Sequence, residues 1–519
     1  MPQGEVESGS PQLEMRAATS GGRRLEFFVA LAGQTSRLEI KAPFNFSQIM
    51  NAMIAMKKIQ PLCLSLLALT GWLTLIPVNA AEPEATNAAA PVTRKSPDWL
   101  AGGVMYEIFP RSFSPTGDFN GITARLDELK DLGVNILWLM PVHPLGEKLK
   151  KGAVGSPYCV RDFYAINPDY GTTNDFKRLI AEAHQRGLKV VMDIVAGHTA
   201  WDSVLMAHPD FYTKDAQGRI HPPYPGWTDV AELNYANPEL RRYMIEMMKY
   251  WLQDYGVDGF RCDTAFTVPV NFWETARTEL EQINPQVIII TDSGAKPALL
   301  SKAFDMDYSG NLFTTLNSVM SGDQPANYLA ESWSHTQDQF GKGALHLRFT
   351  DHHNQDRATT RYGVDGAQAA QALMLTLDGV PLFYNGMEVG DATESADPAL
   401  FEKLPVFWNP GGRPPLREIY RDLIKLRKQY PALQSGELVW LTNSAPDEVL
   451  SFVRRDAKDE FLVLINLSNR RVSATTELLD ATGFEPVPIS GRTKPVDIVL
   501  PDFHLTGYGW FIYHRPTPK

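Results

Sequence analysis

Residues 256–265 read GVDGFRCDTA, and this stretch places a cation and a carboxylate side by side. Successive side chains of a strand point to opposite faces, so Arg261 and Asp263 share one face while Cys262 takes the other. A nearby arginine favours the ionised form of a carboxylate, and a carboxylate must be ionised to attack an electrophile. The alternative is a buried ion pair without chemistry, and this stretch alone does not decide between the two.

Three further apolar stretches show the same pattern, with polar residues at the C-terminal end of each. They read VVMDIVAGH (190–198), QVIIITDSG (286–294) and LRFTDHHNQ (347–355), and segments with helical patterning separate them. A parallel (β/α)8 barrel gathers the residues at the carboxyl ends of its strands into one site. We therefore predict an α/β fold built on such a TIM barrel.

Several longer motifs follow one another between Trp99 and the C-terminus. Besides GFRCD they include VMYEIFPRSF, LGVNILWLMPV, GSPYCVRDFYAINPDYGT and GVPLFYNGMEVGD. With these motifs in this order, the chain resembles the α-amylase family of glycoside hydrolases (glycoside hydrolase family 13). The resemblance implies a (β/α)8 barrel over residues 98–430 and a short B domain inserted after the third strand, at residues 199–233.

The N-terminal part has the pattern of a secretory signal. Residues 56–80 begin with Lys57 and Lys58, continue as an apolar run and end in small residues, which predicts cleavage near Ala80. A membrane anchor is the alternative, because the run is nearly long enough to span a bilayer. We predict a periplasmic or secreted protein with no stable membrane insertion after cleavage. Residues 1–55 are then an upstream extension without a fold, and residues 81–97 a linker.

The C-terminal part changes to short runs with strand alternation. Runs such as ELVWLTN and EFLVLINLS predict an antiparallel β-sandwich domain over residues 431–519. The net charge of −11 argues against a nucleic-acid partner and suits a neutral ligand such as a sugar. After signal removal only Cys159 and Cys262 remain, too few for a disulfide framework.

The resemblance also implies roles for single residues. Asp263 matches the nucleophile of a retaining glycosidase, and Arg261 matches its partner. His198 and His353 match histidines that bind sugar hydroxyls, and Tyr158 matches the aromatic ring that stacks on the sugar at the cleavage position. For the histidines and the tyrosine, packing is the alternative. The implied partner is an α-glucan or maltooligosaccharide, and the sequence leaves the oligomeric state open.

Two carboxylates of the family pattern are missing. A retaining glycosidase needs a second acid about 5 Å from the nucleophile. Counting back from AFDMDYS (303–309) places that acid on Ser293, whose hydroxyl does not ionise near neutral pH. The neighbouring Asp292 is expected to face the helices if Ser293 faces the site, unless a bulge or the end of the strand intervenes. The family's third carboxylate falls on Asn354, which carries no charge.

These departures leave the function open between two main hypotheses. The first is a secreted α-amylase-like glycoside hydrolase or transglycosidase that acts on α-linked gluco-oligosaccharides by a retaining mechanism, with Asp292 as the leading candidate for the acid or with an unusual substrate that has a good leaving group. The second is a catalytically impaired pseudoenzyme that binds maltooligosaccharides. We predict no cofactor, with calcium as the alternative, because the family's calcium-binding asparagine is replaced by Gly197, which has no side chain to coordinate an ion.

Overall fold

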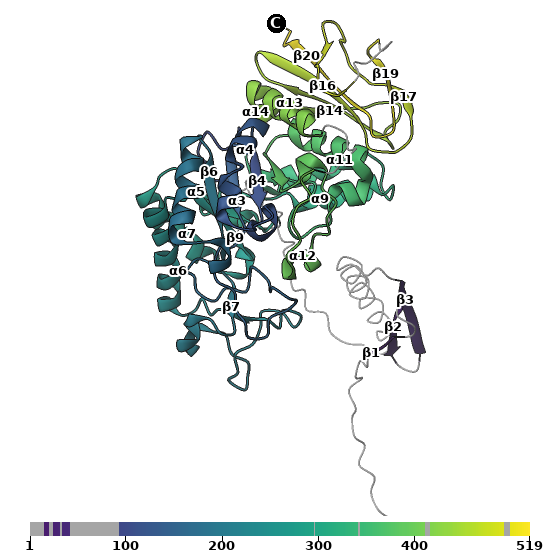
Figure 1. The fold of residues 1–519 in the computed structure, drawn as a ribbon. Coiled ribbons are helices and arrows are strands. Elements are labelled where there is room, and N and C mark those ends of the chain that lie inside the picture. Colours follow the sequence, from purple (N-terminus) through teal and green to yellow (C-terminus); the bar gives the residue numbers. More distant parts are fainter. Residues whose placement is uncertain are drawn as a thin grey trace, which may run out of the picture. The chain divides into compact units, whose positions relative to one another are not determined.

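The computed structural model describes residues 93–518, except residues 295, 341–342, 410–415 and 493–498, together with three strands within residues 15–41. The chain divides into two compact units, residues 1–86 and 87–519. The second unit carries a closed barrel of eight parallel strands in the order β10-β11-β12-β13-β4-β5-β6-β9. The predicted (β/α)8 barrel is therefore confirmed (Figure 1).

Each barrel strand is short and almost completely buried. Buried parallel strands are expected to be apolar along their whole length, which the sequence of this barrel satisfies except at single buried polar residues such as Glu107, Asp193 and Asp307. The eight strands are β4 (Met105–Ile108), β5 (Ile136–Leu139), β6 (Lys189–Val195), β9 (Gly259–Asp263), β10 (Ile288–Thr291), β11 (Met306–Tyr308), β12 (Leu345–Arg348) and β13 (Val380–Tyr384).

Helices follow the strands and cover the outside of the barrel (Figure 1). Local signals fix several of their ends: a reciprocal cap between Thr172 and Asp175 begins α5, and the left-handed Gly133 ends α4. The longer helices of this layer are α4 (Leu126–Leu132), α5 (Thr173–Gln185), α6 (Pro238–Tyr250), α7 (Val270–Ile283), α8 (Pro297–Lys302), α9 (Gly310–Met320), α10 (Tyr328–Phe340), α11 (Ala358–Thr376) and α13 (Leu416–Gln429).

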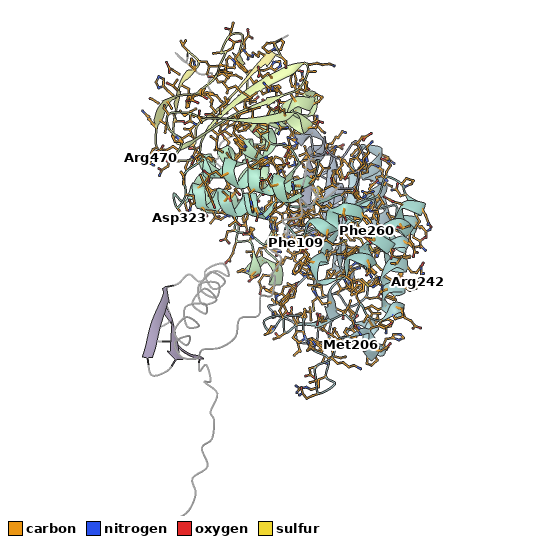
Figure 2. The ribbon with its side chains drawn as sticks, turned by 180° about the vertical axis from the view of Figure 1, so that it is seen from behind. Phe109, Met206, Arg242, Phe260, Asp323 and Arg470 are labelled. Atoms are coloured by element: carbon orange, nitrogen blue, oxygen red, sulfur yellow. The ribbon has the colours of Figure 1, made fainter. Side chains whose placement is uncertain are left out.

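Two apolar cores result from the alternation along the strands. Side chains that point inward fill the barrel with a small cluster that includes Trp138 and Ile290, whereas outward side chains such as Phe260 pack against the helices. Figure 2 labels Phe260 in the part of the molecule that carries the barrel and its helices, and Arg470 in the C-terminal domain. Cys262 belongs to the outer core, as strand alternation predicts from its position beside Arg261.

A short insertion follows the third barrel strand. It begins with β7 (His198–Ala200), which pairs antiparallel with β8 (Val230–Glu232), and two 3-10 turns lie between them, Val204–Ala207 and Pro209–Phe211. This is the short B domain that the resemblance implies. Its first residue, His198, is three residues beyond Val195, and Val195 pairs with Asp263 of β9. The insertion therefore begins beside the polar end of β9.

The C-terminal part is a β domain, as predicted. A five-stranded antiparallel sheet has the order β14-β15-β16-β20-β18, and β17 pairs with β19 in a second, two-stranded sheet. The short α14 (Pro431–Ser435) connects α13 to this domain. Its strands are β14 (Glu437–Leu441), β15 (Val449–Arg455), β16 (Asp459–Asn466), β17 (Val472–Thr475), β18 (Glu485–Pro486), β19 (Asp502–Leu505) and β20 (Trp510–Pro516).

The N-terminal unit differs from the expectation that residues 1–55 have no fold. It contains an antiparallel sheet of β1 (Met15–Thr19), β2 (Arg24–Leu31) and β3 (Gln34–Lys41). Strand-forming residues in RLEFFVAL and alternation in QTSRLEIK account for the pairing. The predicted signal, residues 56–80, lies outside the described residues. Within the part of the chain that is described, no helix combines the length and hydrophobicity needed to cross a bilayer.

Candidate active site

Arg261 lies at the centre of a group of carboxylates inside the barrel. Its Nη1 donates to Asp263 Oδ1 at 2.7 Å and to Asp193 Oδ1 at 3.0 Å, and its Nη2 donates to Asp292 Oδ2 at 3.3 Å. Arg261 and Asp263 therefore lie side by side, as the alternation predicts. One buried guanidinium thus joins a carboxylate within β6, one at the end of β9 and one just after β10, which are neighbouring strands.

The position of Asp292 depends on where its strand ends. β10 ends at Thr291, so the strict alternation of the strand no longer applies to the next residue, which is the exception that the sequence analysis named. Asp292 accepts a hydrogen bond from Arg261 and a second one, at 2.8 Å, from the backbone N–H of Thr264. The leading candidate for the acid is therefore on the same guanidinium as Asp263.

The backbone just after Asp263 is bent so that it holds Asp292. Thr264 has φ +49°, a left-handed conformation that is unfavourable for a β-branched residue. This conformation accompanies the hydrogen bond from the Thr264 N–H to Asp292. Strain of this kind costs on the order of 1–3 kcal/mol and clusters at functional sites.

The pKa values of the three carboxyls are raised, mainly by burial. Burial raises the pKa of Asp193 to about 7 and that of Asp292 to about 6, although Arg261 opposes both shifts and Asp263 adds to them. Burial also raises the pKa of Asp263, again against Arg261. One guanidinium cannot neutralise three buried carboxylates, so this group of side chains holds a proton more readily than isolated aspartates do.

Aromatic rings enclose the guanidinium. The rings of Trp138, Tyr158 and Tyr308 have their centroids 5.3, 5.8 and 5.5 Å from the Arg261 Cζ atom. Tyr308 also accepts a hydrogen bond from Arg261 Nε at 3.1 Å. These contacts fix the plane of the guanidinium, and with it the places of the carboxylates that it binds.

A second polar chain runs from Tyr158 to the first barrel strand. The Tyr158 hydroxyl lies 3.1 Å from Asp193 Oδ2 and 2.8 Å from His353 Nε2, and the other nitrogen of His353 contacts the carboxyl of Glu107. Glu107 is completely buried in β4. The structure therefore brings Tyr158, Arg261, Asp263, Asp292 and His353 into one continuous network.

Comparison with known proteins agrees with this arrangement. The family model "Alpha amylase, catalytic domain" matches residues 107–217 and 224–292. The crystal structure of an α-amylase from Lactobacillus plantarum has a TM-score of 0.73 and 30% sequence identity, and the match covers 80% of this chain and 99% of that one. The chain belongs to the α-amylase family of glycoside hydrolases.

Curated relatives show the same affiliation at lower identity. The α-amylase MalA of Haloarcula japonica is 29% identical over 396 residues, which cover 72% of this chain and 56% of that protein. A cyclomaltodextrinase of Geobacillus thermopakistaniensis is 28% identical over 450 residues, which cover 77% of this chain and 73% of that protein. This α-amylase-family chain thus spans little more than half the length of the first relative.

The other predicted site residues of this family member lie around the network. His198 is buried, with its ring 5.5 Å from that of Trp227, and burial lowers its pKa to about 4. Its Nδ1 is itself buried and has no hydrogen-bond partner among the described residues. Trp227, which contacts His198, and Tyr224, which contacts Trp227, expose 37% and 40% of their surfaces. Sugar binding by His198 remains a prediction.

Ser293 and Asn354 are the residues on which the resemblance places two further family carboxylates, and this placement remains a prediction. Ser293 is buried, and its backbone N–H donates to Thr291 Oγ1 at 3.1 Å. Asn354 is exposed, and its backbone N–H lies 3.3 Å from His352 Nδ1. The residue before Ser293, Asp292, reaches the network.

The position of the family's calcium ligand does not fit a metal. A Cβ atom built on Gly197 would lie 2.7 Å from Thr264 Oγ1 and 3.0 Å from Thr267 Oγ1, which leaves no room for a coordinating side chain. In the described part of the chain, no three acidic, histidine or cysteine side chains are grouped as metal ligands would be. Independence from calcium remains a prediction.

Restoring the family's asparagine tests that prediction. We expect Gly197→Asn to lower the melting temperature, since crowding of this kind typically costs about 1–3 kcal/mol, and we expect added calcium not to restore it. Gly310→Ala is the matched control, because nothing lies within 4 Å of a Cβ at that glycine. The melting temperatures of both variants are measured with calcium and with a chelator. A melting temperature of Gly197→Asn that calcium restores would contradict independence from calcium.

Sequence reasoning missed two members of the network, Asp193 and Glu107. Each is an acidic residue within an otherwise apolar barrel strand, in VVMDIV and in VMYEIF. Completely buried carboxylates are rare unless they are paired, so a charge in the middle of such a strand was the available signal. The sequence did not show which partner each would have, because both partners lie far away along the chain.

Proposed function

We propose that the chain is a secreted glycoside hydrolase that cleaves α-linked gluco-oligosaccharides with retention of configuration. Asp263 is the nucleophile and Asp292 the proton donor. The observation that supports this assignment is that both carboxylates accept hydrogen bonds from one guanidinium, that of Arg261. The distance between the two carboxylates therefore cannot exceed the width of one guanidinium plus two hydrogen bonds. The two carboxyl groups of a retaining glycosidase must lie this close together.

The two carboxyls suit different steps of this reaction. Asp263, beside the cation, attacks the anomeric carbon while Asp292 gives its proton to the departing glycosidic oxygen. Asp292 then takes a proton from water, and that water displaces Asp263 and releases the sugar with its original configuration. A donor with a pKa of about 6 is partly protonated near neutral pH, as an acid catalyst must be.

The pH dependence follows from these assignments. Asp292 must be protonated in the first step, so kcat/KM for maltooligosaccharides should decline as the pH rises above about 6. The acidic decline belongs to Asp263, which must be ionised, and burial moves that decline upward from the range of an ordinary aspartate. A pH–rate profile measures both limbs.

A second candidate function is maltooligosaccharide binding without turnover. Asn354 favours it, because the family's third carboxylate stabilises positive charge in the transition state and an amide does not. An activated aryl α-glucoside distinguishes the candidates, since its leaving group departs without a proton. Turnover of that substrate supports the hydrolase, whereas binding of maltooligosaccharides by calorimetry without any turnover supports the binding protein.

Asn354→Asp provides a gain-of-function test. Residue 354 is exposed, so a carboxylate can be introduced there without burying a charge. We expect kcat for maltooligosaccharides to rise by about 10²-fold, the typical value of one preorganised electrostatic partner. Asn354→Gln is the matched control, with a neutral side chain of similar chemistry. An unchanged kcat in Asn354→Asp would remove residue 354 from the proposed site.

A further inference from the structure

Each of the two ring nitrogens of His353 has an oxygen atom as its neighbour, but a neutral ring has only one N–H to donate. Its Nδ1 contacts Glu107, and its Nε2 lies 2.8 Å from the Tyr158 hydroxyl. Burial, together with the nearby cation of Arg261, lowers the pKa of His353, so the ring is neutral and carries one N–H. That N–H can stand on either nitrogen, and its place decides what Glu107 and Tyr158 must do.

Tyr158 has a single proton and two neighbours that could accept it. Its hydroxyl can donate to Asp193 Oδ2 at 3.1 Å or to His353 Nε2 at 2.8 Å. If Nε2 carries the imidazole proton, Nε2–H donates to the tyrosine oxygen, and the tyrosine donates to Asp193. If Nδ1 carries it, the tyrosine must donate to Nε2 and leaves Asp193.

The surroundings of Glu107 favour one of these two tautomers of His353. Its side chain is completely buried, and its Oε2 has no hydrogen-bond partner among the described residues. An ionised carboxylate with one bare oxygen in such a place is costly, whereas a carboxylic acid needs no second donor. As an acid, Glu107 donates its proton to Nδ1, which must then be the unprotonated nitrogen of the ring.

We propose that Glu107 is a positioning residue that acts as a neutral carboxylic acid. By donating to His353 Nδ1 it fixes the Nε2–H tautomer, and through Nε2–H it turns the Tyr158 hydroxyl toward Asp193. The chain of donors then runs in one direction, from Glu107 through His353 and Tyr158 to Asp193. The consequence for turnover rests on the proposed function, but the tautomer itself does not.

Loss of one proton from Glu107 reverses this chain. The acid proton leaves to solvent, the ring N–H moves to Nδ1 and faces the carboxylate, and the Tyr158 hydroxyl rotates to donate to Nε2. Asp193 then keeps its bonds from Arg261 and Trp138 but loses that of Tyr158. The titratable or charged groups that face Glu107 and His353 from neighbouring elements are Arg261, Tyr308, Asp351, His352, Arg357 and Tyr384.

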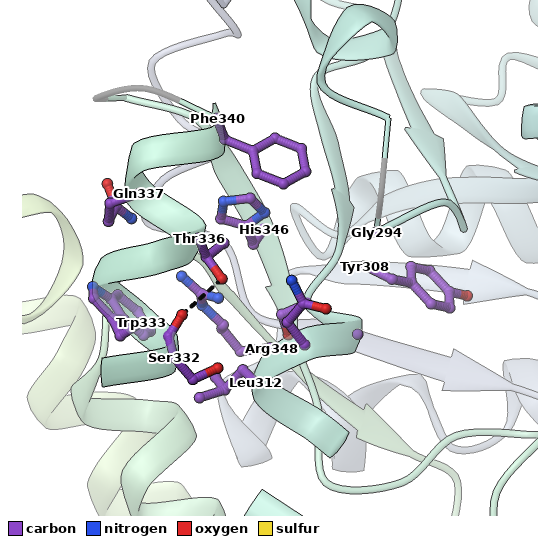
Figure 3. Close-up of a pocket in the computed structure, with 13 residues that line it drawn as sticks. Gly294, Tyr308, Leu312, Ser332, Trp333, Thr336, Gln337, Phe340, His346 and Arg348 are labelled. Atoms are coloured by element: carbon purple, nitrogen blue, oxygen red, sulfur yellow. Dashed lines mark hydrogen bonds between the residues drawn. The ribbon is translucent and has the colours of Figure 1, made fainter. Parts of the chain in front are cut away.

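Two substitutions separate the proton from the shape of the side chain. In Glu107→Gln the amide N–H₂ donates to Nδ1 as the acid does, and it cannot lose its proton. Glu107→Met has similar size but no donor. Asp307→Asn is the matched control: Asp307 contacts His346 Nδ1 in a second buried carboxyl–imidazole pair, which lies outside the carboxylate network. Figure 3 shows His346 beside Thr336 and Phe340, which line a pocket together with Tyr308.

Nitrogen NMR of the full chain, labelled at its histidines, reads the tautomer without any substrate. The signals of His353 are assigned by their absence in His353→Gln. Below neutral pH we expect the Nε2–H tautomer in the wild type, in Glu107→Gln and in Asp307→Asn, and loss of this preference in Glu107→Met. As the pH rises, the wild type should convert to Nδ1–H while Glu107→Gln does not. An Nδ1–H tautomer in the wild type below neutral pH would overturn the proposal.

Stability against pH gives an independent measurement. The pKa of Glu107 is raised by burial in the folded state, so its contribution to stability is present below the ordinary carboxyl pKa and is lost as the pH rises through the raised value. The wild type should therefore lose stability relative to Glu107→Gln over that interval. A constant difference between the two proteins across the same pH range would contradict a neutral Glu107.

Turnover supplies the third measurement. We expect kcat/KM of Glu107→Met to fall on the order of 10-fold, the factor that corresponds to one unsatisfied buried hydrogen-bonding group, and that of Glu107→Gln to fall less. If the wild type turns over no glucoside, the proposed function fails, whereas the NMR experiment still decides the role of Glu107. Equal losses in the two variants would show that a donor to His353 Nδ1 makes no difference to turnover and would overturn the positioning role.

Discussion

Replacing Asp263 by alanine is expected to reduce turnover of an aryl α-glucoside by about 10⁴-fold or more, because the attacking group itself is lost. The leaving group of this substrate needs no proton, so the loss can be attributed to nucleophilic attack rather than to acid catalysis. Steady-state or single-turnover release of the phenol measures the effect.

Azide makes this experiment specific. In Asp263→Ala the small anion can enter the space left by the carboxylate and attack the anomeric carbon from the same side, so we expect added azide to restore phenol release and to yield the β-glucosyl azide. Asp307→Asn, which also removes a buried carboxylate but outside the network, should remain active without azide. Full activity of Asp263→Ala without azide would exclude Asp263 as the nucleophile.

Asp292→Asn is expected to affect two classes of substrate to very different extents. Hydrolysis of maltooligosaccharides should fall by about 10²- to 10⁴-fold, because their leaving oxygen needs a proton. Formation of the glycosyl–enzyme from an activated aryl α-glucoside should fall much less. The decline of activity above pH 6 should also disappear, since the group that causes it is gone. Rates for both substrates across pH measure these effects.

Ser293→Ala is the matched control for this prediction. Ser293 is the residue that counting along the sequence assigns to the acid, and it stands next to Asp292 in the chain. If Asp292 is the donor, the serine variant should hydrolyse maltooligosaccharides at nearly the wild-type rate. A large loss in Ser293→Ala, with little loss in Asp292→Asn, would show that the count along the sequence was right and the assignment from geometry wrong.

The barrel could be predicted from the sequence because each strand is a short apolar run with polar residues at one end. The periodicity of two placed Arg261 and Asp263 on one face, where they are found in contact. The C-terminal sheet could be predicted equally well, because the alternation of apolar and polar residues in ELVWLTN and EFLVLINLS is a local property of the chain. By contrast, the strands in residues 15–41 were missed, although RLEFFVAL has the composition of a strand.

The site was predicted less completely, for two physical reasons. The face of Asp292 stayed open because alternation holds only within a strand, and the sequence did not show that β10 ends at Thr291, where the chain turns toward Thr264. Glu107 was not considered at all, since its contact with His353 joins residues that are 246 positions apart. Local sequence patterns identify candidate residues. The neighbours that determine the protonation of those residues come together only when the barrel closes.

A covalent trapping experiment tests most directly whether Asp263 attacks the anomeric carbon. A fluorosugar with a fluoride leaving group forms a glycosyl–enzyme that hydrolyses slowly, and its formation needs no proton donor. Mass spectrometry of the digested protein then locates the sugar. We expect one sugar per chain, esterified to Asp263. A sugar on another residue, or an unmodified chain under conditions in which fluoride is released, would contradict it.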